Sequence, residues 1–342
     1  MRITATVVNS DKSFSQVILR YSTRAKNLNP YMTEKDIQEI GKKHYGEVPK
    51  EIIRKTIGMC NEVYELVFSG ESVILRMNKE KEWIYGTHKF LPLFKQLKIK
   101  TPEILIEDYT KESFPFCYQI LTKVEGKDLL EVFHTLSTAQ LKGIAQEVSD
   151  IMDKFKSLPP VESFGGFTGL NESHEEDLLS ILLNKRKDIE ERNKVSGIFD
   201  EEILDIHKRL LEKYTPYFLQ VKPRLYYDDL NSKNVMIYKG KFNGLVDLDF
   251  LLKGDYLESI GSIQAVWYGT ELGEIYINEI LKCQGLDSYH RNIINVYTIF
   301  TLMGWSMEAG VVHNGNSTGV INWDRIKKAR KKIKAIYASI QG

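Results

Sequence analysis

The stretch that decides the fold of this 342-residue chain runs Pro223-Arg224-Leu225-Tyr226-Tyr227-Asp228-Asp229-Leu230-Asn231-Ser232-Lys233-Asn234-Val235-Met236-Ile237. A Lys-Gly-Lys-Phe-Asn turn follows, and a second apolar run, Gly244–Leu248, ends beside the acidic pair Asp247 and Asp249. The pattern predicts a β-hairpin with strands at Val235–Tyr238 and Gly244–Leu248. A loop rich in Asp and Asn precedes the first strand.

Three oxygen-bearing side chains meet at one end of this predicted hairpin. Asn234 directly precedes the first strand, Asp247 closes the second, and Asp229 lies five positions before Asn234. Carboxylate and amide oxygens are the ligands that Mg²⁺ prefers, and phosphoryl transfer also needs a carboxylate to accept the hydroxyl proton. Asp and Asn are common turn residues too. The ordered set of loop, strand, turn and acidic strand end favours the chemical interpretation over an ordinary turn.

Composition excludes several classes of protein. The chain is 42% hydrophobic and 27% charged, with a net charge of +1, which is typical of a globular protein and not of a nucleic-acid or membrane-surface binder. No apolar run is long enough to span a bilayer. The three cysteines are far apart and suit a reducing compartment, so we expect a cytoplasmic protein.

The predicted secondary structure changes near residue 124. Short β-prone runs dominate before it, and helical periodicity follows it, as in the capping box Ser137-Thr138-Ala139-Gln140 that opens a helix to about residue 158. We therefore predict an α+β, bilobal chain with a small β-rich N-lobe and a larger, mostly helical C-lobe. The expected parts are an N-terminal extension over 1–30, which fits a β-hairpin, an N-lobe over 31–124 and a C-lobe over 125–342.

The segment around Asp229 resembles the catalytic region of aminoglycoside phosphotransferases and related small-molecule kinases, which share a protein-kinase-like fold. The resemblance implies that Asp229 is the catalytic aspartate and that Asn234 and Asp247 are the metal ligands. Gly254-Asp255 matches the Gly-Asp that follows in the family. One departure is Tyr227, which stands where the family has His and leaves reduced activity as an alternative.

The N-lobe supports the same resemblance. Gly58-Met59-Cys60-Asn61 is similar to the family's nucleotide loop, so Gly58 and Asn61 are expected at the phosphates of ATP or GTP. Arg76, in a β-prone run, matches the phosphate-binding cation, and Arg is always charged and able to fork onto phosphate oxygens. Its acidic partner is expected on the next helix, with Glu80 and Glu82 as candidates.

Two further expectations concern the base and the acceptor. Thr122 and Val124 lie where the family binds adenine through the backbone. Between residues 125 and 320 there are 30 acidic and 20 basic residues, an excess that suits a cationic acceptor, although solvated helix faces explain it as well. The candidate acceptor contacts are acidic and aromatic residues of the C-lobe, namely Asp255, Glu258, Trp267 and Glu271.

We therefore predict an enzyme that moves the γ-phosphoryl group of ATP or GTP, with Mg²⁺, to a hydroxyl of a small, cationic molecule. An aminoglycoside-like acceptor is favoured, and resistance to such antibiotics is the biological role it implies. The alternatives are a kinase of a metabolic alcohol (choline, homoserine or a thio-sugar) and a nucleotide-binding pseudoenzyme. The chain lacks the Asp-Phe-Gly and Ala-Pro-Glu motifs of protein kinases. We expect a monomer or dimer without nucleic-acid or membrane partners.

Overall fold

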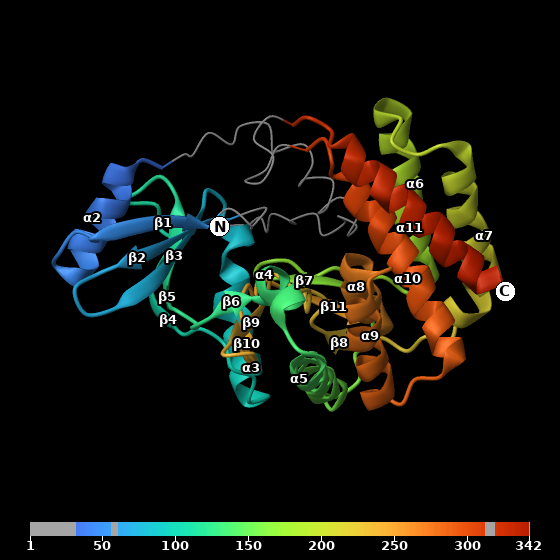
Figure 1. Ribbon diagram of the computed structural model, residues 1–342. Helices are drawn as coiled ribbons and strands as arrows, with labels where there is room; N and C mark the ends of the chain where they lie inside the picture. Colours follow the sequence, from blue (N-terminus) through green and yellow to red (C-terminus); the bar gives the residue numbers. More distant parts are fainter. Residues whose placement is uncertain (1–31, 56–60, 312–318, 342) are drawn as a thin grey trace, which may run out of the picture.

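The computed structural model describes residues 32–55, 61–311 and 319–341, and it is arranged as a sheet-based lobe and a helical lobe (Figure 1). The predicted α+β bilobal fold is confirmed. The expected hairpin within residues 1–30 lies outside the described residues, as does Gly58.

The first lobe is built on a five-stranded antiparallel sheet with the strand order β1-β2-β3-β5-β4. Its elements, in chain order, are α2 (Glu34–Tyr45), β1 (Glu51–Lys55), β2 (Glu62–Val67), β3 (Ser72–Asn78), a 3₁₀ turn (Lys81–Trp83), α3 (Tyr85–Gln96), β4 (Ile104–Asp108) and β5 (Cys117–Thr122). Helix α2 begins with a capping box in which Thr33 and Asp36 satisfy each other's backbone N–H groups. Its apolar face packs on the sheet through Ile37 and Ile40, which closes the core of this lobe.

Helix α3 differs from its prediction. The sequence pattern over Glu82–Leu97 predicts one helix with a break or bend at Pro92, yet α3 runs unbroken through Pro92 and the interruption falls at Ile84. No side chain of the preceding residues caps α3.

The chain crosses to the second lobe over residues 123–128, where β6 (Lys127–Asp128) pairs with β9. Two small sheets follow, with the orders β10-β9-β6 and β7-β11-β8. Their strands are β7 (Gly165–Thr168), β8 (Arg224–Tyr226), β9 (Val235–Tyr238), β10 (Lys241–Leu245) and β11 (Phe250–Gly254). The predicted hairpin is present, but β10 begins and ends three residues earlier than expected, because Lys239 and Gly240 alone (φ +51° and +73°) form the turn and Lys241 already pairs with Tyr238.

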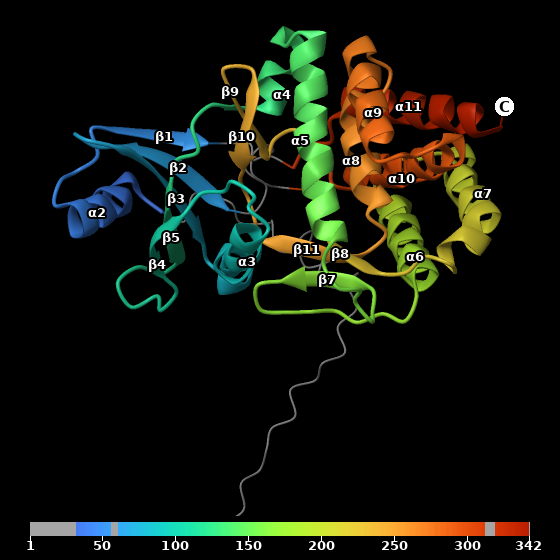
Figure 2. The same cartoon turned by 90° about the horizontal axis from the view of Figure 1, so that it is seen from below.

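Helices make up the rest of the second lobe. They are α4 (Leu129–Val132), a 3₁₀ turn (Phe133–Thr135), α5 (Thr138–Lys156), α6 (Leu178–Ser196), α7 (Glu201–Phe218), α8 (Leu257–Trp267), α9 (Glu271–Cys283), α10 (Ser288–Met307) and α11 (Trp323–Gln341). Figure 2 shows α5 beside α9 and α8, with α6, α7 and α11 on the side away from the sheet. None of the helices in the described ranges is long and apolar enough to cross a membrane.

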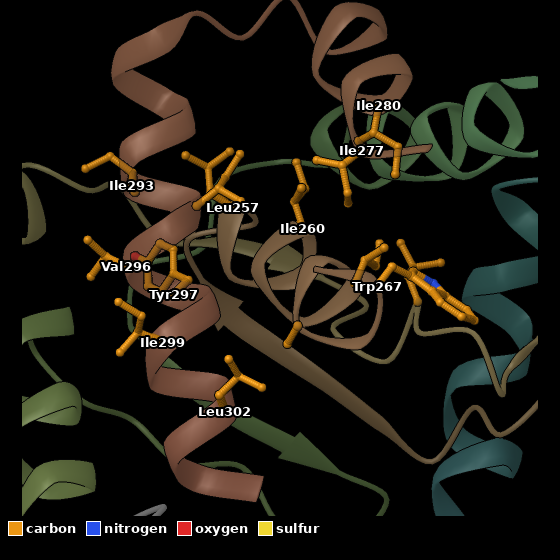
Figure 3. Close-up of a cluster of buried hydrophobic side chains, with 14 of the residues drawn as sticks. Leu257, Ile260, Trp267, Ile277, Ile280, Ile293, Val296, Tyr297, Ile299 and Leu302 are labelled. Carbon is orange, nitrogen blue, oxygen red and sulfur yellow. The ribbon is translucent and has the colours of Figure 1, made fainter. Parts of the chain in front are cut away.

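The core of this lobe is centred on α8, α9 and α10, whose aliphatic side chains interdigitate (Figure 3). Helices α8 and α10 approach closely at Gly261, where an added Cβ would lie 2.6 Å from the Cβ of Tyr297. Closely packed interiors leave no room for such an atom without a shift of the backbone. This contact sets the position of α8, which begins shortly after β11, the strand that follows the acidic loop.

We expect Gly261→Ala to lower the free energy of unfolding by about 1–3 kcal/mol, because it overpacks the α8–α10 contact. Gly143, on the exposed face of α5, is the matched control, because no atom of the residues that the structure describes lies within 4 Å of the position of an added Cβ. Gly143→Ala should stabilise the protein by about 0.5–1 kcal/mol through helix propensity. Urea unfolding measures both, and equal effects of the two substitutions would contradict this description of the core.

Candidate active site

One cavity of about 900 Å³ lies between the five-stranded sheet and the helical lobe. Its walls come from β2, β3 and β5 on one side and from α6, α8 and α10 on the other. The residues singled out from the sequence that line this cavity are Asn61, Arg76, Glu82, Thr122, Val124, Asp229, Asn234, Asp247 and Glu258. Side chains from distant parts of the chain are therefore gathered around one space.

Asp229 is held in place by the amides of its own loop. The Nδ2 atom of Asn234 donates to Asp229 Oδ2 at 2.5 Å and to the backbone oxygen of Asp229 at 3.0 Å. Asn231 Nδ2 donates to the other carboxylate oxygen. Burial and the nearby Asp247 raise the pKa of Asp229, while Lys233 opposes the rise. A carboxylate with a raised pKa is a stronger proton acceptor, as a general base requires.

Tyr227 ties this loop to the backbone around Asp247. Its ring is 1% exposed and packs edge-on against Phe94, with 5.4 Å between the ring centroids. Its hydroxyl donates to the backbone oxygen of Asp247 at 2.8 Å and lies 3.1 Å from that of Val246. Asp247 has a φ of +64°, which is uncommon for a residue other than glycine. The Tyr227 hydroxyl thus helps to hold the strained turn that ends β10.

Arg76 does not pair with the acids expected for it. Its guanidinium, 5% exposed on β3, contacts Asp247 Oδ1 at 2.9 Å and Asp249 through Nη2. Glu82 instead accepts a hydrogen bond from Asn171 at 2.5 Å, so the prediction of a partner at Glu80 or Glu82 was wrong. Burial lowers the pKa of Arg76, but Asp249 and Asp247 raise it by more, and the guanidinium stays charged.

The wall beneath the sheet provides an apolar slot. It is lined by Val63, Ile74, Leu121, Met236 and Val246. At its edge the Thr122 N–H is already used, because it donates to Glu103 O at 2.9 Å. Val124 lies just beyond β5, and its N–H makes no backbone hydrogen bond to any residue in the described ranges. Of the two residues expected at the base, Val124 is therefore the one with a backbone donor to offer.

Three of the four residues expected at the acceptor lie outside the cavity lining. Trp267 is 5% exposed and stacks on Phe133, with 3.6 Å between ring centroids, inside the core of the helical lobe (Figure 3). Asp255 accepts hydrogen bonds from Tyr217 and Tyr297 at 2.6 and 2.9 Å and so ties buried helices together. Glu271 lies in the first turn of α9. Only Glu258, which pairs with Lys185 at 2.7 Å, lines the cavity.

The cavity continues between α6, α7 and α10 and contains polar residues that sequence reasoning missed. Buried atoms without a hydrogen-bond partner among the described residues include Asp228 Oδ1, Asp188 Oδ1 and His207 Nδ1, and all three residues line the cavity. Burial, with Arg186 nearby, lowers the pKa of His207 to about 3, so its ring is neutral. The doubled Asp at 228–229 was a visible signal, but residues 188 and 207 belong to ordinary helical patterns that carry none.

The donor atoms at the loop fit a divalent ion shared with phosphates. Asp247 keeps Oδ2 clear of Arg76, and Asn234 directs its amide nitrogen to Asp229, so its Oδ1 remains as a ligand atom. The described residues contain no group of three or more His, Cys, Asp or Glu side chains able to hold a metal together. One carboxylate and one amide oxygen form the sparse, all-oxygen set that Mg²⁺ uses when substrate phosphates and waters complete its shell.

Comparison with known proteins was made by sequence and by structure. Residues 56–291 match the model of the phosphotransferase enzyme family, APH, whereas no curated protein sequence matches the chain significantly. The structure is similar to a thermostable mutant of aminoglycoside phosphotransferase APH(4)-Ia, with 16% identity and a TM-score of 0.67 over 89% of this chain and 99% of that one. Its ternary complex with ADP and hygromycin B matches at 16% identity and a TM-score of 0.68, over 90% and 99% of the chains.

The structure is similar to a second type of aminoglycoside phosphotransferase as well. The GDP and kanamycin complex of APH(2″)-IIIa is 15% identical to this chain, with a TM-score of 0.65 over 90% of this chain and 99% of that one. At such low identity the structural matches establish the fold, while the family is established by the sequence match over residues 56–291.

Removal of the Tyr227 hydroxyl tests its hold on the turn at Asp247. We expect Tyr227→Phe to lower the free energy of unfolding by about 1–2 kcal/mol, because a buried hydrogen bond to a backbone carbonyl is lost. Tyr276→Phe is the matched control, since the buried Tyr276 hydroxyl has no partner among the described residues and its loss should be neutral or stabilising. Thermal unfolding at pH 7 compares the two, and an equal loss in both would contradict a specific role for the Tyr227 hydroxyl.

Proposed function

The chain belongs to the phosphotransferase enzyme family, and from this premise we propose that it transfers the γ-phosphoryl group of ATP or GTP to a hydroxyl of a small, cationic molecule. The observation that carries the proposal is the convergence of Asp229, Asn234 and Asp247 on one cavity between the lobes. Phosphoryl transfer needs little covalent chemistry from a protein, so the arrangement of these groups is the main contribution that the chain has to make.

Each residue of the site is assigned a role in the proposed reaction that its chemistry supports. Asp229 accepts the proton of the acceptor hydroxyl and orients that hydroxyl, which its fixed position and raised pKa support. Asn234 and Asp247 would hold Mg²⁺, which when bound neutralises the phosphate charge. Arg76 orients the phosphates, and Asn61, at the start of β2, lies beside it through their shared contact with Asp249. Val124 would present its N–H to the base, which stacks in the apolar slot.

Nucleotide as the phosphoryl donor is supported by the solved relatives as well. Structures of APH(4)-Ia variants contain ADP or AMP-PNP, and structures of aminoglycoside 2′-phosphotransferase-IIIa contain GDP. The slot of this chain is lined by side chains that are apolar and by a backbone donor, neither of which distinguishes adenine from guanine. Both ATP and GTP are therefore proposed as donors.

The acceptor is proposed to enter the part of the cavity between α6, α7 and α10. Buried acceptor atoms without a partner are costly, so Asp228 Oδ1 and Asp188 Oδ1 favour a ligand that brings N–H or O–H donors. Amines with several hydroxyls, as in an aminoglycoside-like molecule, meet this demand. A metabolic amino alcohol such as homoserine is the second candidate, and a quaternary ammonium such as choline has no N–H to donate.

The proposed role of Asp229 is tested by Asp229→Ala. We expect nucleotide affinity to change less than about threefold while transfer to an acceptor falls at least a thousandfold, since general-base catalysis and orientation are both lost. Calorimetry with Mg²⁺-nucleotide measures the first quantity, and a coupled ADP-release assay with kanamycin and homoserine measures the second. Failure of the unaltered protein to bind nucleotide with Mg²⁺ would refute the proposal.

A regulatory pseudoenzyme is the competing possibility, and Tyr227 in place of the family's His is the reason to consider it. Retained nucleotide binding, with no transfer by the unaltered protein to any member of a library of hydroxylated amines, would favour this alternative. The hydrogen bonds of the Tyr227 hydroxyl argue against it, because they order the same loop that an active enzyme needs.

Asp228 provides a test with opposite effects on stability and on acceptor binding. Burial, reinforced by Asp229 and Glu258, raises the pKa of Asp228 to about 8. The native protein therefore keeps a proton that the unfolded chain releases near pH 4, and the stability linked to Asp228 falls as the pH rises between these values. We expect Asp228→Asn to raise the melting temperature by about 2–4 °C at pH 9 and to leave it unchanged at pH 4.

The same substitution should raise the KM for an amine-bearing acceptor at least tenfold, because a bound ammonium group favours the ionised form of Asp228 and the neutral amide cannot supply that charge. The matched control is Asp205→Asn, which removes an exposed carboxylate paired with Arg209 on α7, outside the cavity. A melting temperature that responds equally to both substitutions, or an unchanged KM in Asp228→Asn, would contradict the proposed acceptor site.

A further inference from the structure

The buried guanidinium of Arg76 takes both of its acidic partners from the other lobe. Helix α3, the next helix after β3, contains no Asp or Glu, so no acid on that helix is available to Arg76. Asp247 and Asp249, both from the loop after β10, contact the same Nη2 atom. The Nη1 atom donates to Thr87 Oγ1 at 2.8 Å. A guanidinium that is 5% exposed requires a counter-ion at all times.

Asp249 does more than neutralise Arg76, because it also forms the N-terminal cap of α3. Its Oδ1 atom accepts hydrogen bonds from the Thr87 backbone N–H at 2.8 Å and from Thr87 Oγ1 at 2.7 Å. No neighbouring side chain caps α3, and a carboxylate at a helix N-terminus is favourable. Gly86 permits this approach, since a Cβ there would overlap the backbone carbonyl of Asp249. The late start of α3 follows from this contact.

The same carboxylate reaches the strand that follows the expected nucleotide loop. Asp249 Oδ2 accepts a hydrogen bond from Asn61 Nδ2 at 3.1 Å, and Asn61 Oδ1 accepts one from Asn78 Nδ2 at 2.9 Å. One residue of the second lobe thus contacts the start of β2, the middle of β3 and the first turn of α3. Asp249 therefore connects the first lobe, through hydrogen bonds and an ion pair, to the loop that contains Asp247.

Asp247 has two competing tasks under the proposed function, on which this inference rests. Its Oδ1 atom lies 2.9 Å from Arg76, yet its carboxylate is also the proposed Mg²⁺ ligand. A carboxylate that neutralises a buried guanidinium alone would be a poorer ligand for a dication, since giving up the guanidinium would leave a buried charge unpaired. Asp249, 14% exposed, contacts the same guanidinium, so Arg76 has a counter-ion besides Asp247.

We propose that Asp249 is a positioning residue that holds Arg76 and thereby frees Asp247 to bind the metal ion of the metal–nucleotide complex. It takes the place of an acid on the neighbouring helix, and it couples the position of α3 to metal binding. The competing interpretations are a purely structural helix cap and a direct metal ligand. Each of these predicts a different result for the experiment below.

The test measures the affinity of the full-length chain, saturated with ADP, for Mn²⁺ by the loss of the free-ion signal in electron paramagnetic resonance. We expect Asp249→Asn to weaken Mn²⁺ binding at least tenfold, because Asp247 is then the one carboxylate of the described residues that still pairs with Arg76. The double variant Arg76→Met/Asp249→Asn removes the guanidinium and should bind Mn²⁺ within threefold of Arg76→Met alone, because no guanidinium then competes for Asp247. Asp205→Asn, the matched loss of a carboxylate on α7, should not change it.

Two outcomes would overturn the inference. Unchanged Mn²⁺ affinity in Asp249→Asn would leave only a structural cap, and a double variant that binds Mn²⁺ at least tenfold more weakly than Arg76→Met would make Asp249 a metal ligand. If Asp249→Asn does not fold, Arg76→Met and the double variant carry the test, and a tenfold difference between them contradicts the proposal. Failure of the unaltered protein to bind ADP and Mn²⁺ would refute the proposed function itself. Failure of this inference alone would instead leave binding by the unaltered protein intact.

Discussion

The contact on which the arrangement of the site depends is the buried ion pair between Arg76 of β3 and the carboxylates of Asp247 and Asp249. The first lobe contributes the cation and the second lobe both acids, so neither lobe neutralises this charge on its own. A buried charge without a partner is strongly unfavourable, and the pair therefore favours an arrangement in which the two lobes face each other. The backbone turn at Asp247, bound by the Tyr227 hydroxyl, brings both carboxylates to that contact.

The residues around Asp229 were predictable because their positions are set by local geometry. A loop that leads into a β-hairpin places Asn234 and Asp247 at the same end, and the structure has this hairpin between β9 and β10. Helix α5 begins at the capping box that the sequence indicated, with Ser137 as its N-cap. The short strands β6, β7, β8 and β11 were missed, since two to five residues give too little periodicity to identify a strand.

The partners of Arg76 were not predictable by the same reasoning. Glu80 and Glu82 were selected because they are near in sequence, whereas Asp249 is 173 residues away along the chain. Pairing across a lobe boundary has no periodic signature in one sequence, and the capping of α3 by Asp249 follows from the same long-range contact. The position of Trp267 was also not predictable from the sequence. An aromatic residue near a helix end fits a ligand platform or a core position equally well, and here it stacks on Phe133 in the core.

The polar atoms of the cavity lower the stability of the native protein, and a binding role accounts for their presence. Asp228, Asp188 and His207 each bury an atom without a partner among the described residues, and such atoms lower the stability of the native state. Departures from local rules of packing and hydrogen bonding are expected at sites where a ligand completes the interactions. The three atoms lie along one continuous cavity that also contains Asp229. A ligand with several hydrogen-bond donors would pair with these buried atoms together while presenting a hydroxyl to Asp229. The destabilisation that the unpaired atoms cause in the free protein would then be relieved on binding and would contribute to the affinity for that ligand.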